Sequence, residues 1–349
     1  MKRFYCDCGL EVFFEDRSCR NCGQDVGFDV ESLTMLSVIP AHDGVYQSRD
    51  GHTFRQCGNW IDHDVCNWLI PECSSNRLCG ACQFNRTIPN QTVIDVRPPV
   101  NYLRWVRLEE AKKRLLFTLM RLGIPIKNGW DDPQQGLVFD FLEDMNPADP
   151  EHFLPITTGY SQGVITINSI EADDVARVSA KSALNERQRT ILGHFRHESG
   201  HYFWDRLLSQ MPASGDFVEV FGHAVDSYRQ SLDAYYQNGP PNDWSENFIS
   251  AYASAHPSED WAETWNHYLL ISDGLETAFE LGMTPHLPYG LSIEDMLHSW
   301  RKLAVTINHL NRSIGVHDAY PFVISSKTEA KLRYVASLID RFRRQGGAN

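Results

Sequence analysis

The sequence is poor in positive charge, has no cysteine beyond residue 82 and contains no long apolar run. Its 32 Lys and Arg residues are outnumbered by 45 Asp and Glu residues, which gives a formal net charge of −13. This balance argues against a general binder of nucleic acid or of anionic membranes. The lack of an apolar run of roughly 20 residues argues against a membrane-spanning helix.

The first residues also lack the apolar stretch of a secretory signal peptide, because Met1–Cys6 leads directly into cysteines. We therefore expect a cytoplasmic protein. In a reducing compartment, closely spaced cysteines are metal ligands more often than disulfide partners. All nine cysteines fall within the first 82 of 349 residues, which indicates a separate module. We predict this cysteine-rich module at residues 1–88 and a larger domain at residues 100–345.

The first cysteine group consists of two close pairs separated by ten residues: Cys6, Cys8, Cys19 and Cys22. A glycine directly after each pair, Gly9 and Gly23, supplies the backbone freedom that tight metal-binding turns need. Leu10–Phe14 between the pairs is strand-like. Four thiolates on two such turns can surround zinc tetrahedrally, so the spacing predicts a structural zinc ribbon.

The remaining cysteines suggest a second cysteine group. Cys79-x-x-Cys82 has the spacing of half a zinc site, and Cys57 and Cys66 are the partners that we favour, with Cys73 left over. The alternative is a set of buried free thiols, because the spacing of the other three is irregular.

The cysteine-rich module lacks the basic residues of a nucleic-acid-binding zinc ribbon. Residues 1–100 contain nine Lys or Arg against thirteen Asp or Glu. A basic surface is the expected footprint of nucleic-acid binding. We therefore expect the ribbon to contact a protein partner or to stabilise its own small domain.

The rest of the chain predicts strands followed by helices. Residues 83–100 contain several prolines and are typical of a linker. A helix is expected over Leu103–Leu122, strands over Gly136–Leu142 and Gly163–Ile167, and a long helix over Ser182–Leu208. Helices then continue to the end of the chain, which predicts an α+β domain that is mainly helical. The second strand could serve as an edge to which an extended peptide adds.

The most informative motif is His197-Glu198-Ser-Gly-His201 within the long predicted helix. Residues four apart lie on one helical face, so both imidazoles can reach one metal ion. The intervening Glu198 is then placed to take a proton from a water molecule at that ion. This H-E-x-x-H arrangement is typical of zinc hydrolases.

A zinc hydrolase needs a third protein ligand. The metzincin extension fails because Trp204 and Leu207 occupy the positions of its glycine and histidine. A glutamate on a downstream helix is the remaining option, and Glu259 follows Pro257, a residue suited to a first helical turn. Glu263 shares its helical face and could hydrogen-bond a ligating histidine. The alternative is that both are ordinary acidic residues stabilised by the helix dipole.

Together these motifs resemble a bacterial family of zinc-dependent metallopeptidases that carry an N-terminal zinc ribbon. The resemblance covers nearly the whole chain and includes the first cysteine group, Cys66-Asn-Trp, the motif at 197–201 and His256-Pro-Ser-Glu-Asp-Trp-Ala-Glu263. The larger domain also resembles gluzincins in which a tyrosine precedes the ligand glutamate by seven residues. That resemblance implies that Tyr252 donates its phenol to a developing oxyanion. Many gluzincins have aspartate where this chain has Glu263.

The preferred hypothesis is a zinc metallopeptidase with His197, His201 and Glu259 as ligands and Glu198 as general base. It would use one catalytic zinc and one or two structural zinc ions, and its substrate would be a peptide or protein. The alternative is a silent or latent scaffold that binds a protein partner through its ribbon. The intact Glu198 disfavours a silent scaffold, which has no need of a general base.

Overall fold

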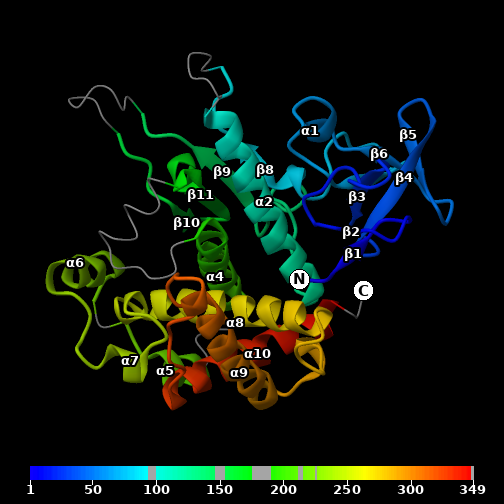
Figure 1. The fold of residues 1–349 in the computed structure, drawn as a ribbon. Helices are drawn as coiled ribbons and strands as arrows, with labels where there is room; N and C mark the ends of the chain where they lie inside the picture. The colour runs from blue at the N-terminus through cyan, green and yellow to red at the C-terminus, as the bar shows by residue number, and fades with distance from the viewer. Residues whose placement is uncertain (93–99, 146–153, 175–189, 211–214, 225, 347–349) are drawn as a thin grey trace.

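The computed structural model describes residues 1–92, 100–145, 154–174, 190–210, 215–224 and 226–346. A β-rich N-terminal region lies at one side of the molecule, and the mainly helical C-terminal region makes up the rest (Figure 1). This arrangement confirms the predicted α+β class with a cysteine-rich ribbon region followed by a mainly helical domain. No helix in the described ranges is long and apolar enough to cross a membrane.

The N-terminal region contains two antiparallel sheets. In the smaller sheet, β1 (Phe4–Tyr5) pairs with β2 (Glu11–Val12), which lies within the predicted strand Leu10–Phe14. The larger sheet has the order β3-β4-β5-β6-β7, and the sequence analysis did not predict it. Its strands are Asp25–Asp29, Thr34–His42, Val45–Ser48, Thr53–Gln56 and Leu69–Pro71. The short helix α1 (Gly58–Ile61) follows β6.

The prediction of a linker at residues 83–100 is wrong for residues 83–87. The 3-10 helix η1 (Cys82–Phe84) runs directly into β8 (Asn85–Thr87), which pairs in parallel with β9 (Val138–Leu142). The Asn85 side chain contacts the buried Glu109 and Lys112 of α2 (Val100–Arg121). The cysteine-rich region is therefore connected to the larger domain through paired backbone and buried polar contacts.

The sheet of the larger domain has the order β10-β11-β9-β8. β11 (Val164–Asn168), followed by the 3-10 helix η2 (Ser169–Ala172), pairs with β9 on one side and with β10 (Gly159–Ser161) on the other. The expectation that the strand at Gly163–Ile167 could form an open edge is therefore wrong. Among the described strands, the two edges of this sheet are β10 and β8.

The helix α4 (Ile191–Gln210) carries the 197–201 motif and packs against this sheet. Phe195 of α4 lies fully buried against Phe139 and Phe141 of β9, with ring centroids 5.5 and 5.9 Å apart. The part of the predicted helix at residues 182–189 lies outside the described residues. From residue 191 onward the predicted helix is present.

The helix α8 (Pro257–Glu280) crosses α4 at very short range. A Cβ atom at Gly200 would lie 2.9 Å from the Cα of Ala262, so only glycine allows this approach. The indole of Trp261 donates a hydrogen bond of 2.8 Å to the carbonyl of Gly200, and Trp265 donates one of 3.0 Å to Ser199 Oγ. These contacts fix the first half of α8 beside the motif.

A buried polar cluster joins three helices beneath the site. Thr118 of α2 donates to the carboxylate of Asp273 on α8, and Arg196 of α4 pairs with the same carboxylate. Because Arg196 directly precedes His197, this cluster aligns the motif with α8. Charged groups this deep in a protein are stable only when they are paired in this way.

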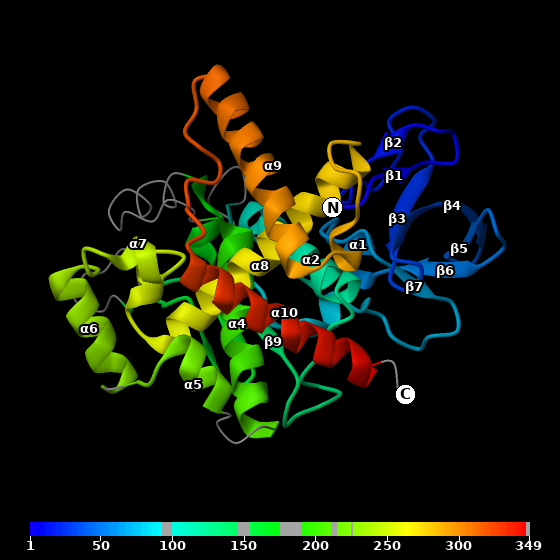
Figure 2. The same ribbon diagram turned by 90° about the horizontal axis from the view of Figure 1, so that it is seen from below.

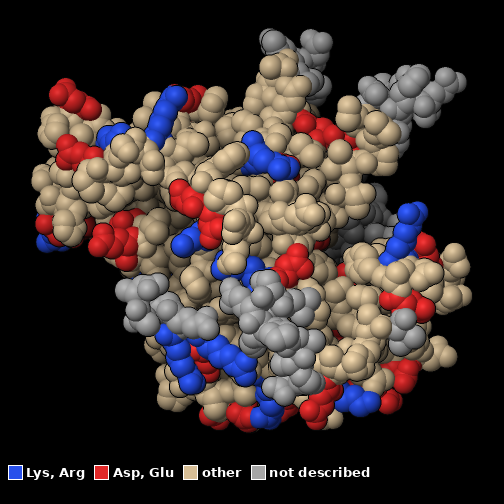
Figure 3. Space-filling view, turned by 180° about the vertical axis from the view of Figure 1, so that it is seen from behind, with Lys and Arg blue, Asp and Glu red and all other residues tan. Residues whose placement is uncertain are grey.

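The remaining helices surround α8 and extend away from the ribbon. α9 and α10 pack along α8, while α5, α6 and α7 lie on the side opposite the ribbon (Figures 1 and 2). The bounds are Gly215–Phe221 for α5, Tyr228–Asn238 for α6, Trp244–Asn247 for α7, Ile293–Ser313 for α9 and Ser326–Gly346 for α10. Two 3-10 helices lie between them: η3 at Tyr252–Ser254 and η4 at Pro288–Gly290. On the face seen in Figure 3, basic side chains are interspersed with acidic ones.

Candidate metal centres

The crossing of α4 and α8 brings His197, His201 and Glu259 together. The two Nε2 atoms of the histidines lie 3.2 Å apart. Oε2 of Glu259 lies 3.0 Å from Nε2 of His197, and its Oε1 lies 3.3 Å from Nε2 of His201. The alternative that Glu259 is only an acidic residue of a first helical turn does not explain this convergence, because its side chain is fully buried against both imidazoles.

The spacing and the chemistry of these three side chains fit zinc. Tetrahedral nitrogen and oxygen donors at zinc bond lengths lie about 3.3 Å apart. The two Nε2 atoms lie 3.2 Å apart, and each lies 3.0 to 3.3 Å from one of the two oxygens of Glu259, which is close to that value. Oε2 of Glu259 is buried and has no hydrogen-bond partner, which leaves it free to bind a cation.

Glu263 fixes the tautomer of His197. Its Oε1 lies 2.7 Å from Nδ1 of His197, and Ser250 Oγ donates a 2.6 Å hydrogen bond to its Oε2. Burial raises the pKa of Glu263, but the hydrogen bond and charge of His197, together with His267 and Ser250, outweigh burial and lower the pKa to about 2. The carboxylate therefore accepts the Nδ1 proton, and the lone pair of Nε2 faces the other two donors. Glu263 thus reaches the imidazole even though it is one methylene longer than aspartate.

Two further predicted residues border this centre. Glu198 is buried, and burial is the main reason that the pKa of its carboxyl is raised. The ring centroid of Tyr252, in η3, lies 5.9 Å from that of His197. Burial likewise raises the pKa of the Tyr252 phenol, so its hydroxyl stays protonated and can donate a hydrogen bond.

The sequence analysis missed Tyr228 and Ser250. The hydroxyl of Tyr228, the first residue of α6, donates a 2.7 Å hydrogen bond to Oε1 of Glu259. A Ser227-x-x-Gln230 capping box marks the start of this helix in the sequence, but it does not indicate what the helix contacts. Ser250 follows no recognisable pattern, and only the fold reveals its bond to Glu263.

The first cysteine group is assembled at the surface. Its four sulfur atoms lie within 4.8 Å of one another, with Cys6 to Cys22 at 3.5 Å and Cys8 to Cys19 at 3.6 Å. Four thiolates around one zinc ion lie about 3.8 Å apart, so the group fits a single ion. Cys8 and Cys22 are exposed, whereas the other two are buried.

The second cysteine group is assembled in the core from the residues favoured in the sequence: Cys57, Cys66, Cys79 and Cys82. All four are buried, and the sulfurs of Cys66 and Cys79 lie 3.6 Å apart. Backbone N–H groups of Trp68 and Cys79 donate to sulfurs of the group. Four converging thiols with N–H donors favour a metal site over unrelated buried thiols. Cys73 is exposed and outside the group.

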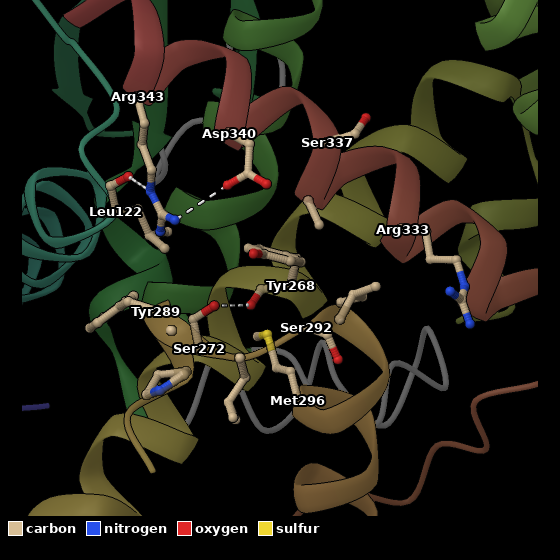
Figure 4. A pocket seen from close by; sticks show the side chains of 15 residues that line it. Leu122, Tyr268, Ser272, Tyr289, Ser292, Met296, Arg333, Ser337, Asp340 and Arg343 are labelled. Carbon is tan, nitrogen blue, oxygen red and sulfur yellow. Dashed lines mark hydrogen bonds and ion pairs between the residues drawn. The ribbon is translucent and has the colours of Figure 1, made fainter. Parts of the chain in front are cut away.

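A cavity elsewhere in the molecule is separate from these centres. It has a volume of about 390 Å³ and lies between α8, α9 and α10, where Tyr268, Ser272, Asp340 and Arg343 are among the lining side chains (Figure 4). Tyr268 and Ser272 follow Glu259 by nine and thirteen residues on α8. At about 1.5 Å per residue they lie roughly 14 to 20 Å further along that helix. The cavity is therefore not part of the metal centre.

The fold and the three groups of metal-binding side chains define a zinc-binding α+β protein with an N-terminal zinc ribbon. The family model described as "Putative zinc-binding metallo-peptidase" matches residues 101–338, and the model of a zinc-ribbon domain matches residues 3–93. The chain belongs to this zinc-binding metallopeptidase family, which confirms the resemblance noted in the sequence.

The relatives extend this match to the whole chain. Uncharacterised proteins of two Mycobacterium tuberculosis strains and of Mycobacterium bovis are 35% identical to it over 352 residues, which covers 97% of this chain and 96% of each relative. No solved structure matches the chain. The chemistry must therefore be argued from the site itself.

Proposed function

We propose that this protein is a zinc-dependent metallopeptidase of the gluzincin type, with His197, His201 and Glu259 as the ligands of its catalytic zinc. The observation that supports this most strongly is that the Nε2 atoms of His197 and His201, on the same helix as Glu198, converge with the unpartnered Oε2 of Glu259 on α8. A bound zinc ion would lower the pKa of water and polarise the substrate carbonyl.

Glu198 is the general base in this proposal. It takes the proton of the attacking water and later delivers it to the leaving amine of the peptide. Its burial supports this role, because a raised pKa brings a carboxylate closer to the range in which it both accepts and returns a proton at neutral pH. Tyr252 donates its phenol to the developing oxyanion, a contribution worth about 3 kcal/mol for one donor.

The substrate is a peptide or protein segment in extended conformation. Because β11 is internal, we assign the strand-addition role to β10, the edge strand that also contacts α4. Main-chain pairing with β10 would hold the scissile bond beside the motif helix. No role for nucleic acid or for a membrane enters this proposal.

We further propose two structural zinc ions, one in each cysteine group, beside the single catalytic ion. The sulfur separations of both groups support this stoichiometry. The cytoplasmic location and a protein partner for the ribbon stay predictions from the sequence. The exposed face of the first cysteine group is where such a partner would bind.

Substitution of Glu198 tests the mechanism. Glu198→Gln keeps the shape of the side chain but removes the base, so kcat against a casein-type substrate should fall by roughly 10²–10⁴-fold. Zinc content and thermal stability should be unchanged. Glu219→Gln, the same change on an exposed residue of α5, is the matched control and should retain wild-type activity. Full activity of Glu198→Gln would disprove the mechanism.

Metal analysis separates the peptidase from a silent scaffold. Wild-type protein should contain three zinc ions and His201→Ala should contain two. An unbiased peptide-library digest with zinc-loaded protein then reveals cleavage and its preferences. A protein that holds the third zinc ion but cleaves no peptide would support the scaffold alternative instead.

A further inference from the structure

The helix α6 lies over the metal centre while burying none of its eleven residues. In Figures 1 and 2 it lies at the side of the molecule opposite the ribbon, near the start of α8. Its first residue, Tyr228, reaches Glu259 although the Tyr228 side chain is 46% exposed. A solvent-accessible helix thus contacts a buried ligand side chain directly.

Two aromatic side chains of α6 reach the neighbourhood of the metal centre. The hydroxyl of Tyr228 donates to Oε1 of Glu259, and its ring packs edge-on against His256 with centroids 5.2 Å apart. The ring of Tyr235 packs edge-on against Tyr252 at 5.7 Å. The hydrogen bond to Glu259 is the strongest of these contacts, because its acceptor is a buried carboxylate.

The helix can move without losing its own structure. Ser227 and Gln230 form a reciprocal capping box that satisfies the first N–H groups within the helix. Gly239 caps the other end with a φ of 73°, and Gly222, before the helix, has a φ of 86°. Both glycines adopt backbone conformations in the left-handed region, which gives the flanking segments freedom to rearrange.

We propose that α6 is a cover that opens to admit substrate, and that Tyr228 is the positioning residue that holds it closed through Glu259. In the closed form Tyr228 fixes Oε1 of Glu259, so that Oε2 points to the metal. Opening breaks the hydrogen bond between Tyr228 and Glu259 and separates the ring of Tyr235 from that of Tyr252, which uncovers the side of the centre bordered by Tyr252. The link to catalysis rests on the proposed peptidase function, whereas the control of metal access does not.

A closed cover lowers apparent affinity, since only the open fraction of the protein can bind a ligand. Loss of a hydrogen bond to a charged group favours opening by roughly tenfold. Tyr228→Phe should therefore lower KM for a peptide substrate by up to about tenfold, a larger change than in kcat. It should also speed metal exchange at this centre.

Metal exchange is the direct test. Zinc loss to excess dipicolinate and zinc uptake by the metal-free centre are followed in wild type, Tyr228→Phe and Gln237→Ala; the phase absent from His201→Ala identifies this centre. Both rates should rise roughly tenfold in Tyr228→Phe. Gln237→Ala, at an exposed position of α6, should behave as wild type. Unfolding temperatures of all variants confirm that the fold is intact.

The outcomes distinguish the cover from other roles of Tyr228. Faster zinc loss with an unchanged uptake rate would mean that Tyr228 only strengthens the ligand, and would overturn the proposal. A fall in kcat at constant KM would place Tyr228 on the reacting atoms, and would also overturn it. If wild-type protein cleaves no peptide, the proposed function fails, but the exchange rates still test the cover.

Discussion

Each of the two cysteine groups consists of four cysteines, but the surroundings of the two groups differ. The first lies on the turn between β1 and β2 and on a second turn before β3, and two of its four cysteines are exposed. The second lies in the core, where its cysteines are at most 2% exposed and where β8 and α2 begin the larger domain. Four thiolates can therefore stabilise local turns at the surface, as in the first group, or form part of the packing between two regions, as in the second group.

The core position also demands charge compensation. Four thiolates around a divalent ion carry a net negative charge, which is costly to bury without a partner. Lys113 of α2 is buried beside the second group and donates a 3.0 Å hydrogen bond to Asn67 Oδ1. Burial lowers the pKa of Lys113, but the negative charge of Cys66 and Glu109 outweighs burial and raises it. The first group needs no such residue because water surrounds half of it.

The largest expected effect comes from removing one ligand of each group. Cys66→Ser should lose the second structural zinc and destabilise the protein by roughly 5 kcal/mol or more, since metal, packing and α2 contacts fail together. Cys8→Ser should lose the first zinc with a much smaller drop in stability, because this group lies at the surface and two of its cysteines are exposed. Thermal unfolding and zinc content measure both effects.

The exposed Cys73, outside both groups, provides the control. Cys73→Ser should leave zinc content and unfolding temperature unchanged. Equal destabilisation by Cys66→Ser and Cys8→Ser would contradict the distinction between a core site and a surface site.

The sequence predicted those parts of the sites that depend on local spacing. His197 and His201 share a helical face wherever the helix lies, and Cys6 with Cys8 must lie on one turn. Glu259 and Glu263 were identified because they form a second local pattern on their own helix. Spacing alone left the partners of Cys79-x-x-Cys82 open, and the structure confirms the favoured Cys57 and Cys66 and leaves Cys73 outside the group.

The features that the sequence did not predict depend on long-range pairing. β8 is a polar three-residue strand that exists only because β9 pairs with it. The short strands of the sheet β3–β7 likewise lack a strong periodic pattern. Tyr228 contacts Glu259 across 31 residues, and no local rule connects the two.

A smaller effect is expected from Lys113, which tests the charge balance of the core group alone. Lys113→Met keeps much of the side-chain volume but removes the cation, so it should destabilise the protein by about 3 kcal/mol. The second group should also release zinc more readily, whereas the first group should be unaffected. Lys302→Met, on an exposed face of α9, is the matched control. Chelator titration of each site checks the result, and equal zinc loss from both groups would rule out a local role for Lys113.

The smallest expected effect is a shift in the pH at which the first group loses zinc. The side-chain amide of Asn21 donates a 3.5 Å hydrogen bond to Cys8 Sγ, and with a backbone hydrogen bond from Leu10 it lowers the pKa of this thiol from 9.0 to about 6. A depressed pKa means that the contribution of the thiolate to stability is complete above about pH 9 and is lost as the pH falls through about 6.

Asn21→Ala removes the larger of these two hydrogen bonds, so the pKa of Cys8 should rise and zinc should leave the first group at a higher pH, by about half a unit. Zinc release between pH 8 and 4, followed with a chromogenic indicator, measures the shift. Asn76→Ala, on the exposed surface of the same region, should leave the release curve in place. The second group contains no exposed thiol, so its release should not respond to Asn21. A shift of both groups together would mean that they open as one unit, and that the surface and core sites are not independent.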